Sequence, residues 1–149
     1  MGRKTESRSR PNSEPLDFEE IEHTADWALR ITGSNLEELL CNAARGMNSL
    51  MVREVGADGS LLEKPVELEA IDAESLLVEW LSELAYWAER EMLVFERFAF
   101  HALTPTHLKA TLYGRAVSAM EKHIKAVTYH NLKIAPTARG LEATVVFDV

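Results

Sequence analysis

Two short stretches near opposite ends of the sequence carry the side chains that could do chemistry. His23, Thr24 and Asp26 belong to the stretch HTAD, and Asp148 interrupts an apolar run just before Val149. If these stretches meet in the fold, the side chains of Asp26 and Asp148 converge with the terminal carboxylate of Val149. Carboxylates that lie so close repel one another unless a cation neutralises them or one of them keeps its proton. A divalent cation with oxygen ligands would satisfy such a group.

These residues also have a purely structural interpretation. Thr and Asp side chains often make turns and caps by bonding to nearby backbone N–H groups. Asp148 would then be no more than a solvated strand end. The spacing does not by itself bring Asp26 and Asp148 together, so both interpretations stay open.

A small basic cluster lies in the C-terminal third of an otherwise acidic chain. Lys122, His123 and Lys125 belong to the stretch KHIKAVTYH, and they come just before a segment with strand character. Loops that precede strands often carry binding groups. A solvated turn is the alternative interpretation.

Composition excludes several classes of protein. The net charge of −8 makes the chain a poor candidate for gripping nucleic acid by itself, and it suits a divalent cation or a basic partner better. Cys41 is the only cysteine, so an intrachain disulfide and a cysteine-based zinc site are both excluded. The usual motifs of nucleotide binding and hydrolysis are missing. No apolar run approaches the roughly 18 to 20 residues of a membrane span, and we expect a cytoplasmic protein.

Hydrophobic periodicity predicts the elements that position these residues. We expect a flexible tail over residues 1–15 and one domain over residues 16–149. Ser34 with Glu37 forms a capping-box pattern at the start of a helix, and Asp72 can cap a second one. The expected elements are a strand over 28–32, a helix over 35–51, a strand over 65–71, a helix from 73, and four strand-like segments from 93 onward. The three tryptophans are expected to anchor the core.

This order of elements indicates an α+β protein. We expect two amphipathic helices packed on one face of a mostly antiparallel sheet, in a strand–helix–strand–strand arrangement.

Four stretches together resemble the archease family. They are FEEIEHTADWALRI, LEELLCNAARGM, KAVTYH and VVFDV, in this order from Phe18 to Val149. Each stretch alone would be a weak signal, whereas HTAD near the start, KAVTYH and a chain ending in Asp-aliphatic form a specific combination.

The resemblance implies a function that periodicity does not show. Archeases are accessory proteins that activate the GTP-dependent RNA ligase of tRNA splicing and are not themselves enzymes. That ligase uses manganese, guanylylates its own histidine and activates an RNA 3′-phosphate. Archease is expected to promote guanylylation and multiple turnover through protein contact, so RNA would be met only through the ligase.

The resemblance also implies roles for individual residues. Asp26 and Asp148 match acidic positions of a metal site, which Val149 joins through its carboxylate. Calcium is the expected ion, with manganese and magnesium as alternatives. His23 would orient Asp26. Lys122, next to His123 and close to Lys125, matches a basic position on the activating surface.

The sequence departs from the family pattern in two places. Gly114-Arg115 stands where relatives often have Gly-Glu, and the link from His123 to Lys125 is short. Two alternative functions remain from the residues themselves. One is a metal-dependent hydrolase or nuclease using Asp26 and Asp148, and the other is a nucleic-acid-binding chaperone.

Overall fold

The structure is a computed structural model that describes residues 17–22, 27–52 and 61–149. The expected tail over residues 1–15 and the HTAD stretch therefore lie outside the described residues. The elements are β1 (Phe18–Glu22), β2 (Trp27–Gly33), α1 (Leu36–Met51), β3 (Leu62–Glu69), α2 (Ala73–Glu91), β4 (Leu93–Thr104), β5 (His107–Ala116), β6 (Ala126–Thr128), β7 (Ala135–Thr137) and β8 (Gly140–Asp148).

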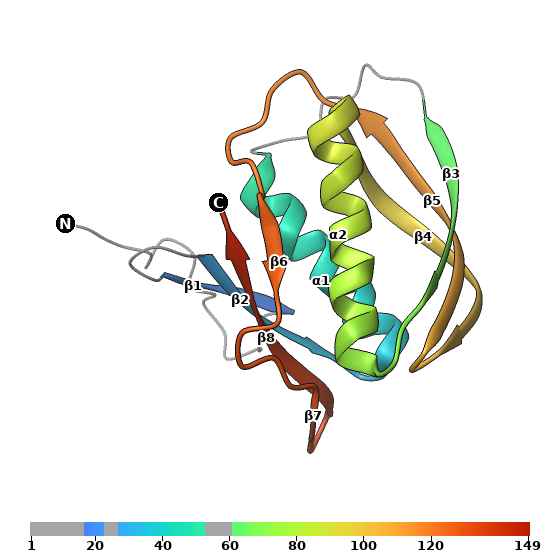
Figure 1. Cartoon of the computed structure of the whole chain (residues 1–149), viewed down its shortest axis with the longest axis vertical. Helices are drawn as coiled ribbons and strands as arrows, with labels where there is room; N and C mark the ends of the chain where they lie inside the picture. The colour runs from blue at the N-terminus through green and yellow to red at the C-terminus, as the bar shows by residue number, and fades with distance from the viewer. Residues whose placement is uncertain (1–16, 23–26, 53–60) are drawn as a thin grey trace.

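The strands form two sheets, and every pairing within them is antiparallel. One sheet has the order β1-β2-β8-β6, with β7 also paired to β8, and the other has the order β3-β5-β4. The two helices lie between the sheets, as Figure 1 shows. The α+β class, the two helices and the antiparallel pairing are confirmed.

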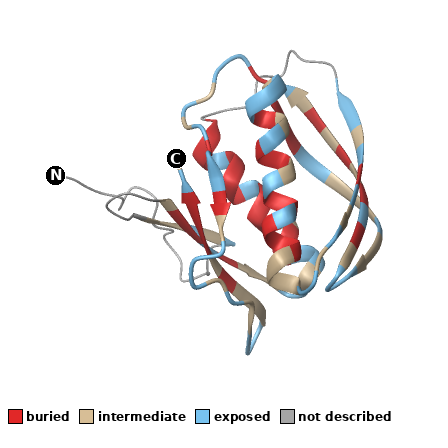
Figure 2. Ribbon diagram, in the orientation of Figure 1, coloured by how far each residue is buried: buried red, intermediate tan, exposed pale blue. Residues whose placement is uncertain are grey.

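The expectation of one sheet was wrong, and the helices give the physical reason. Helix α1 contacts β2 in one sheet and β4 in the other, while α2 contacts β4 and β6. Ten of the sixteen residues of α1 are buried, which is a wider surface than a helix covered on one side presents. Figure 2 accordingly shows the buried positions concentrated between the layers.

The first helix begins one residue later than its capping pattern predicts. Asn35 is the N-cap, and its side-chain oxygen accepts a hydrogen bond from the Glu38 backbone N–H at 2.9 Å. The Ser34 N–H donates in turn to the Glu38 carboxylate at 2.6 Å. The cap is therefore shifted from Ser34 and Glu37 to Asn35 and Glu38, and it differs from a standard capping box because Glu38 accepts from the Ser34 N–H and not from that of the N-cap.

Asp72 caps α2 as expected, which leads to a pH-dependent prediction. Its carboxylate accepts a hydrogen bond from the Ser75 backbone N–H at 2.8 Å, and this bond holds the pKa of Asp72 below its usual value. Because the folded-state pKa is the lower one, this stabilisation is present above pH 3.8 and is lost as the pH falls through the folded value.

We expect Asp72→Asn to make the acid branch of the stability curve shallower, because asparagine also caps helices but does not titrate. The check is the free energy of unfolding in urea at several pH values below 5, with Glu79→Gln at an exposed position of the same helix as control. An unchanged acid slope in Asp72→Asn would contradict the prediction.

Candidate functional site

The strand register brings three chain segments together at one end of the five-stranded sheet. Trp27 at the start of β2 pairs with Phe147, and Ala126 at the start of β6 pairs with Asp148. Strand β8 lies between these two, and Figure 1 shows the C-terminus beside the start of β6. We call this region, made up of Trp27, Ala126, Phe147 and Asp148, the Asp148 end of the sheet.

Asp148 has an accessible carboxylate. Asp148 is exposed, and its backbone carbonyl accepts a hydrogen bond from the Lys125 N–H at 2.7 Å. Within the described parts of the chain, no hydrogen bond or ion pair engages its side chain. The preceding Phe147 is fully buried, so the strand is held firmly up to the residue before Asp148. Val149 is half-buried and packs against the core.

The predicted basic cluster lies in the connection between β5 and β6, and its three residues contact different parts of the protein. The Lys122 ammonium lies 3.9 Å from the centre of the Trp27 ring. The His123 imidazole contacts the Glu89 carboxylate of α2 at 2.8 Å. Lys125 is exposed beside Asp148, where its N–H bonds the Asp148 carbonyl. Lys122 and Lys125 are thus at the Asp148 end of the sheet, while His123 joins the connection to α2.

The backbone of this connection is held by the ends of both helices. The Val117 N–H donates to the Met92 carbonyl at 2.8 Å, directly after α2. The Glu121 N–H donates at 2.6 Å to the carbonyl of Met51, the last residue of α1. The position of the connection between β5 and β6 is therefore set by long-range hydrogen bonds and not by regular secondary structure.

The other half of the predicted acidic site is not placed by the structure. His23 and Asp26 lie outside the described residues, although Asp26 directly precedes Trp27 in the sequence. Among the residues that are described, no three His, Cys, Asp or Glu side chains gather as a metal site would require. Asp148 and Val149 are the predicted ligands that the structure describes, so the metal site remains a prediction.

The position of Trp27 at the Asp148 end of the sheet, in contact with Lys122, was not expected from the sequence. Trp27 was expected to be a core anchor, and it does pack against the core, but unlike the fully buried Trp80 it is only partly buried and carries Lys122 on its ring. Its position immediately after HTAD was the available signal. Nothing local in the sequence indicated that Lys122 would be its neighbour.

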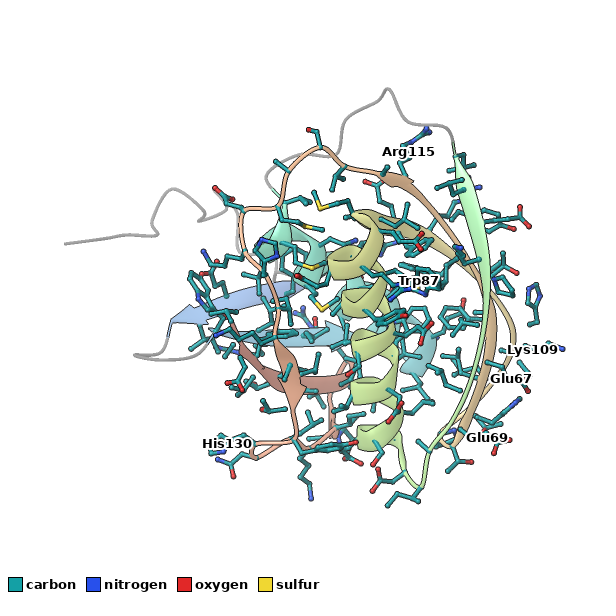
Figure 3. All side chains as sticks on the ribbon, turned by 45° about the horizontal axis from the view of Figure 1, so that its top comes forward. Glu67, Glu69, Trp87, Lys109, Arg115 and His130 are labelled. Atoms are coloured by element: carbon teal, nitrogen blue, oxygen red, sulfur yellow. The ribbon has the colours of Figure 1, made fainter. Side chains whose placement is uncertain are left out.

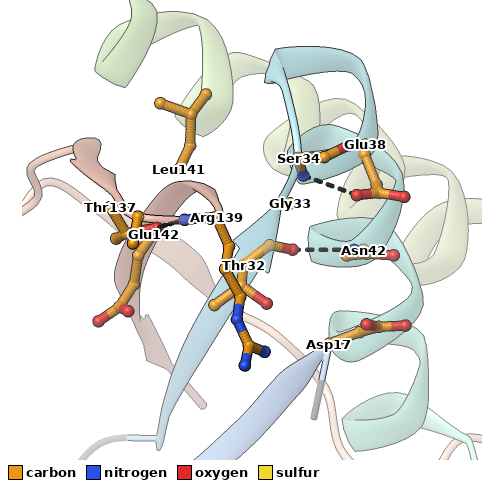
Figure 4. Close-up of a pocket in the computed structure, with 11 residues that line it drawn as sticks. Asp17, Thr32, Gly33, Ser34, Glu38, Asn42, Thr137, Arg139, Leu141 and Glu142 are labelled. Atoms are coloured by element: carbon orange, nitrogen blue, oxygen red, sulfur yellow. Dashed lines mark hydrogen bonds between the residues drawn. The ribbon is translucent and has the colours of Figure 1, made fainter. Parts of the chain in front are cut away.

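A pocket lies at the opposite end of the same sheet. It has a volume of about 450 Å³, and Gly33 and Leu141, which pair with each other, both line it. Figure 4 shows Asp17, Glu38, Arg139 and Glu142 around it. Of the predicted site residues that the structure describes, none lines this pocket. The cavity is therefore separate from the Asp148 end.

The outer face of the three-stranded sheet bears charges of both signs. Glu67 on β3 lies opposite Lys109 on β5, and it also contacts His107 at 2.9 Å. Figure 3 shows Glu67, Glu69 and Lys109 together on this sheet, away from His130. A nucleic-acid-binding face needs clustered positive charge, which this mixture does not provide.

These features define a small α+β domain in which two helices lie between two antiparallel sheets. A polar cluster, made up of Lys122, Lys125 and Asp148, lies at one end of the five-stranded sheet. The family model described as the archease protein family (MTH1598/TM1083) matches residues 18–149. The chain belongs to the archease family. None of the described helices is long and apolar enough to cross a membrane.

Relatives and solved structures agree with this assignment. The chain is 36% identical to protein archease of Methanosarcina mazei over 145 residues, covering 92% of this chain and 99% of the relative. It is 33% identical to the Methanosarcina barkeri protein over 146 residues, covering 93% and 99%.

Two solved structures share the fold. The solution structure of Methanobacterium thermoautotrophicum protein 1598 has a TM-score of 0.66 at 29% identity, covering 89% of this chain and 99% of its own. The crystal structure of a Thermotoga maritima archease, described as a possible chaperone, has a TM-score of 0.63 at 26% identity, covering 95% and 100%.

Proposed function

We propose that this protein is an accessory activator of the GTP- and manganese-dependent RNA ligase of tRNA splicing. It would promote guanylylation of the ligase and allow multiple turnover. The observation that carries this proposal is membership of the archease family across residues 18–149. The polar cluster at the Asp148 end, with its accessible carboxylate, supports it as the site of contact.

The proposed acidic site consists of Asp26, Asp148 and the main-chain carboxyl group of Val149. Asp26 directly precedes Trp27, and Trp27 is in register with the residue before Asp148. A divalent cation suits such a set of oxygen ligands, with calcium first and manganese or magnesium as alternatives. The cation would neutralise the repulsion among the carboxylates. His23 is proposed to orient Asp26.

The proposed contacts with the ligase come from Lys122, His123 and Lys125. Lys125 lies next to Asp148, and Lys122 lies on Trp27 at the same end of the sheet, so acidic and basic groups would meet the partner at one end of the domain. The net charge of −8 favours encounter with a basic RNA-handling enzyme, because complementary charge accelerates association. RNA would be reached only through the ligase.

The test is single-turnover guanylylation of the cognate ligase with GTP and manganese, with and without this protein. We expect a faster reaction with the wild-type protein and none of that increase with Asp26→Ala. Glu142→Ala is the matched control, because Glu142 is near the opposite end of β8 and lines the distant pocket. No rate increase together with no binding to the ligase would reject the activator proposal and favour a metal-dependent hydrolase.

A further inference from the structure

We infer that Trp27 is a positioning residue, whose indole ring holds the Lys122 ammonium at the Asp148 end of the sheet for contact with the partner. This inference rests on the proposed function. It assigns to Trp27 a role that acts entirely through Lys122.

The ring has a rigid base. Trp27 is the first residue of β2, and it pairs with the fully buried Phe147 on one side and with Glu22 of β1 on the other. The Trp27 backbone is therefore paired on both sides within the sheet. A partly buried indole in this position offers one face to a neighbouring segment.

The Lys122 side chain is flexible, so it needs such a contact to keep one position. Its side chain is a long, flexible stem with a compact charge, and it belongs to a connection without regular structure. The backbone N–H of Lys122 lies 3.3 Å from the Met51 carbonyl, which holds the start of the side chain near the ring. The ammonium then lies 3.9 Å from the ring centre, well within the range of a cation–π contact, and tryptophan is the best ring for that contact.

The contact places a positive charge at the end of the sheet where the acidic residues are expected to act. Trp27 follows Asp26 in the chain and stands opposite the residue before Asp148. A partner that meets the carboxylates at this end would meet the ammonium as well. Without the ring, Lys122 would keep its charge but would sample many positions, so binding would have to order it first.

The experiment uses the full-length protein with variants of both residues and a matched control. NMR of the Lys122 side chain reports the stacking directly, because protons above an indole face resonate upfield. Ligase guanylylation is measured over a range of activator concentrations, which separates the half-maximal concentration from the maximal rate. Lys64→Gln is the control, because Lys64 lies 4.3 Å from the Trp87 ring in an equivalent contact elsewhere.

We expect Trp27→Leu to abolish the upfield shift and to raise the half-maximal concentration about two- to five-fold, the range expected for a partly exposed cation–π contact. Trp27→Phe keeps an aromatic face, so it should retain most of the upfield shift and a half-maximal concentration close to that of the wild type. In a Lys122→Gln background, Trp27→Leu should cause no further loss. Lys64→Gln should leave the Lys122 shift and the activation unchanged.

Three results would overturn the inference. One is a wild-type protein without an upfield Lys122 shift. Another is an equal loss from Trp27→Leu with and without Lys122, which would mean that the ring acts on something else. The third is retention of the shift together with loss of activation in Trp27→Phe. A wild-type protein that does not stimulate the ligase at all would instead reject the proposed function, and with it this role.

Discussion

Asp148→Ala should reduce ligase guanylylation to the rate of the ligase alone while leaving the fold intact. The side chain is exposed and makes no hydrogen bond or ion pair with the described residues, so its removal costs the fold little. The hydrogen bond from the Lys125 N–H uses the Asp148 backbone and would survive. The loss would come from the missing carboxylate of the proposed acidic site. Single-turnover guanylylation beside far-UV circular dichroism measures both effects.

Two further variants separate the explanations for such a loss. Asp148→Asn keeps the shape and one oxygen but removes the charge, so it should lose activation as well if a cation or a basic partner group is bound. Glu142→Ala near the other end of β8 should remain active. Unfolding of Asp148→Ala would show that Asp148 is structural and would refute its assignment to the site.

Trp80→Ala should have the largest effect on stability, with a loss of about 3 to 5 kcal/mol in the free energy of unfolding. Trp80 is fully buried, and its ring packs edge-on against Phe98 at 5.1 Å between centroids and near Phe100 at 5.5 Å. Its indole N–H donates to the Leu40 carbonyl at 2.9 Å, which joins α2 to α1. Truncation would therefore leave a cavity and remove a contact between the two helices. Urea denaturation followed by circular dichroism provides the measurement.

The matched comparison is Trp87→Ala on the same helix. Trp87 is half-buried, and its indole N–H donates to the partly exposed Glu83 carboxylate, so its loss should cost much less. Because domains are stable by only about 5 to 15 kcal/mol, Trp80→Ala could fail to fold. Trp80→Phe then serves as the milder variant, with an expected cost of about 1 kcal/mol for the lost indole hydrogen bond, because the Leu40 carbonyl keeps its helical partner within α1. A smaller loss of unfolding free energy in Trp80→Ala than in Trp87→Ala would contradict the prediction.

Local patterns in the sequence predicted the helices well. The predicted helix over 35–51 corresponds to α1, and Asp72 caps α2 as expected. The one-residue error at the first cap arose because Ser34 and Asn35 are both good capping residues. The extended backbone of Asn35, and with it the bond to the Glu38 N–H, decides between them. Sequence pattern alone does not specify that conformation.

Strand assignment was less complete than helix assignment. The segments from residue 93 onward correspond to β4, β5, β6 and β8, but β1 and the three-residue β7 were not expected. β1 carries FEEIE, a short and charged stretch that becomes a strand by pairing with β2. Short strands of this kind depend on their neighbours more than on their own residue types.

The sequence by itself determined the two helices, most of the strands and, through its four motifs, the family to which the chain belongs. Only the tertiary structure decided that the strands divide into two sheets around the helices, and that Lys122 lies on Trp27 at the Asp148 end of the sheet. Periodicity reports which face of an element is buried, because that depends on residues a few positions apart. Strand pairing and side-chain contact depend on residues far apart in the chain, whose proximity is set by the packing of the whole domain.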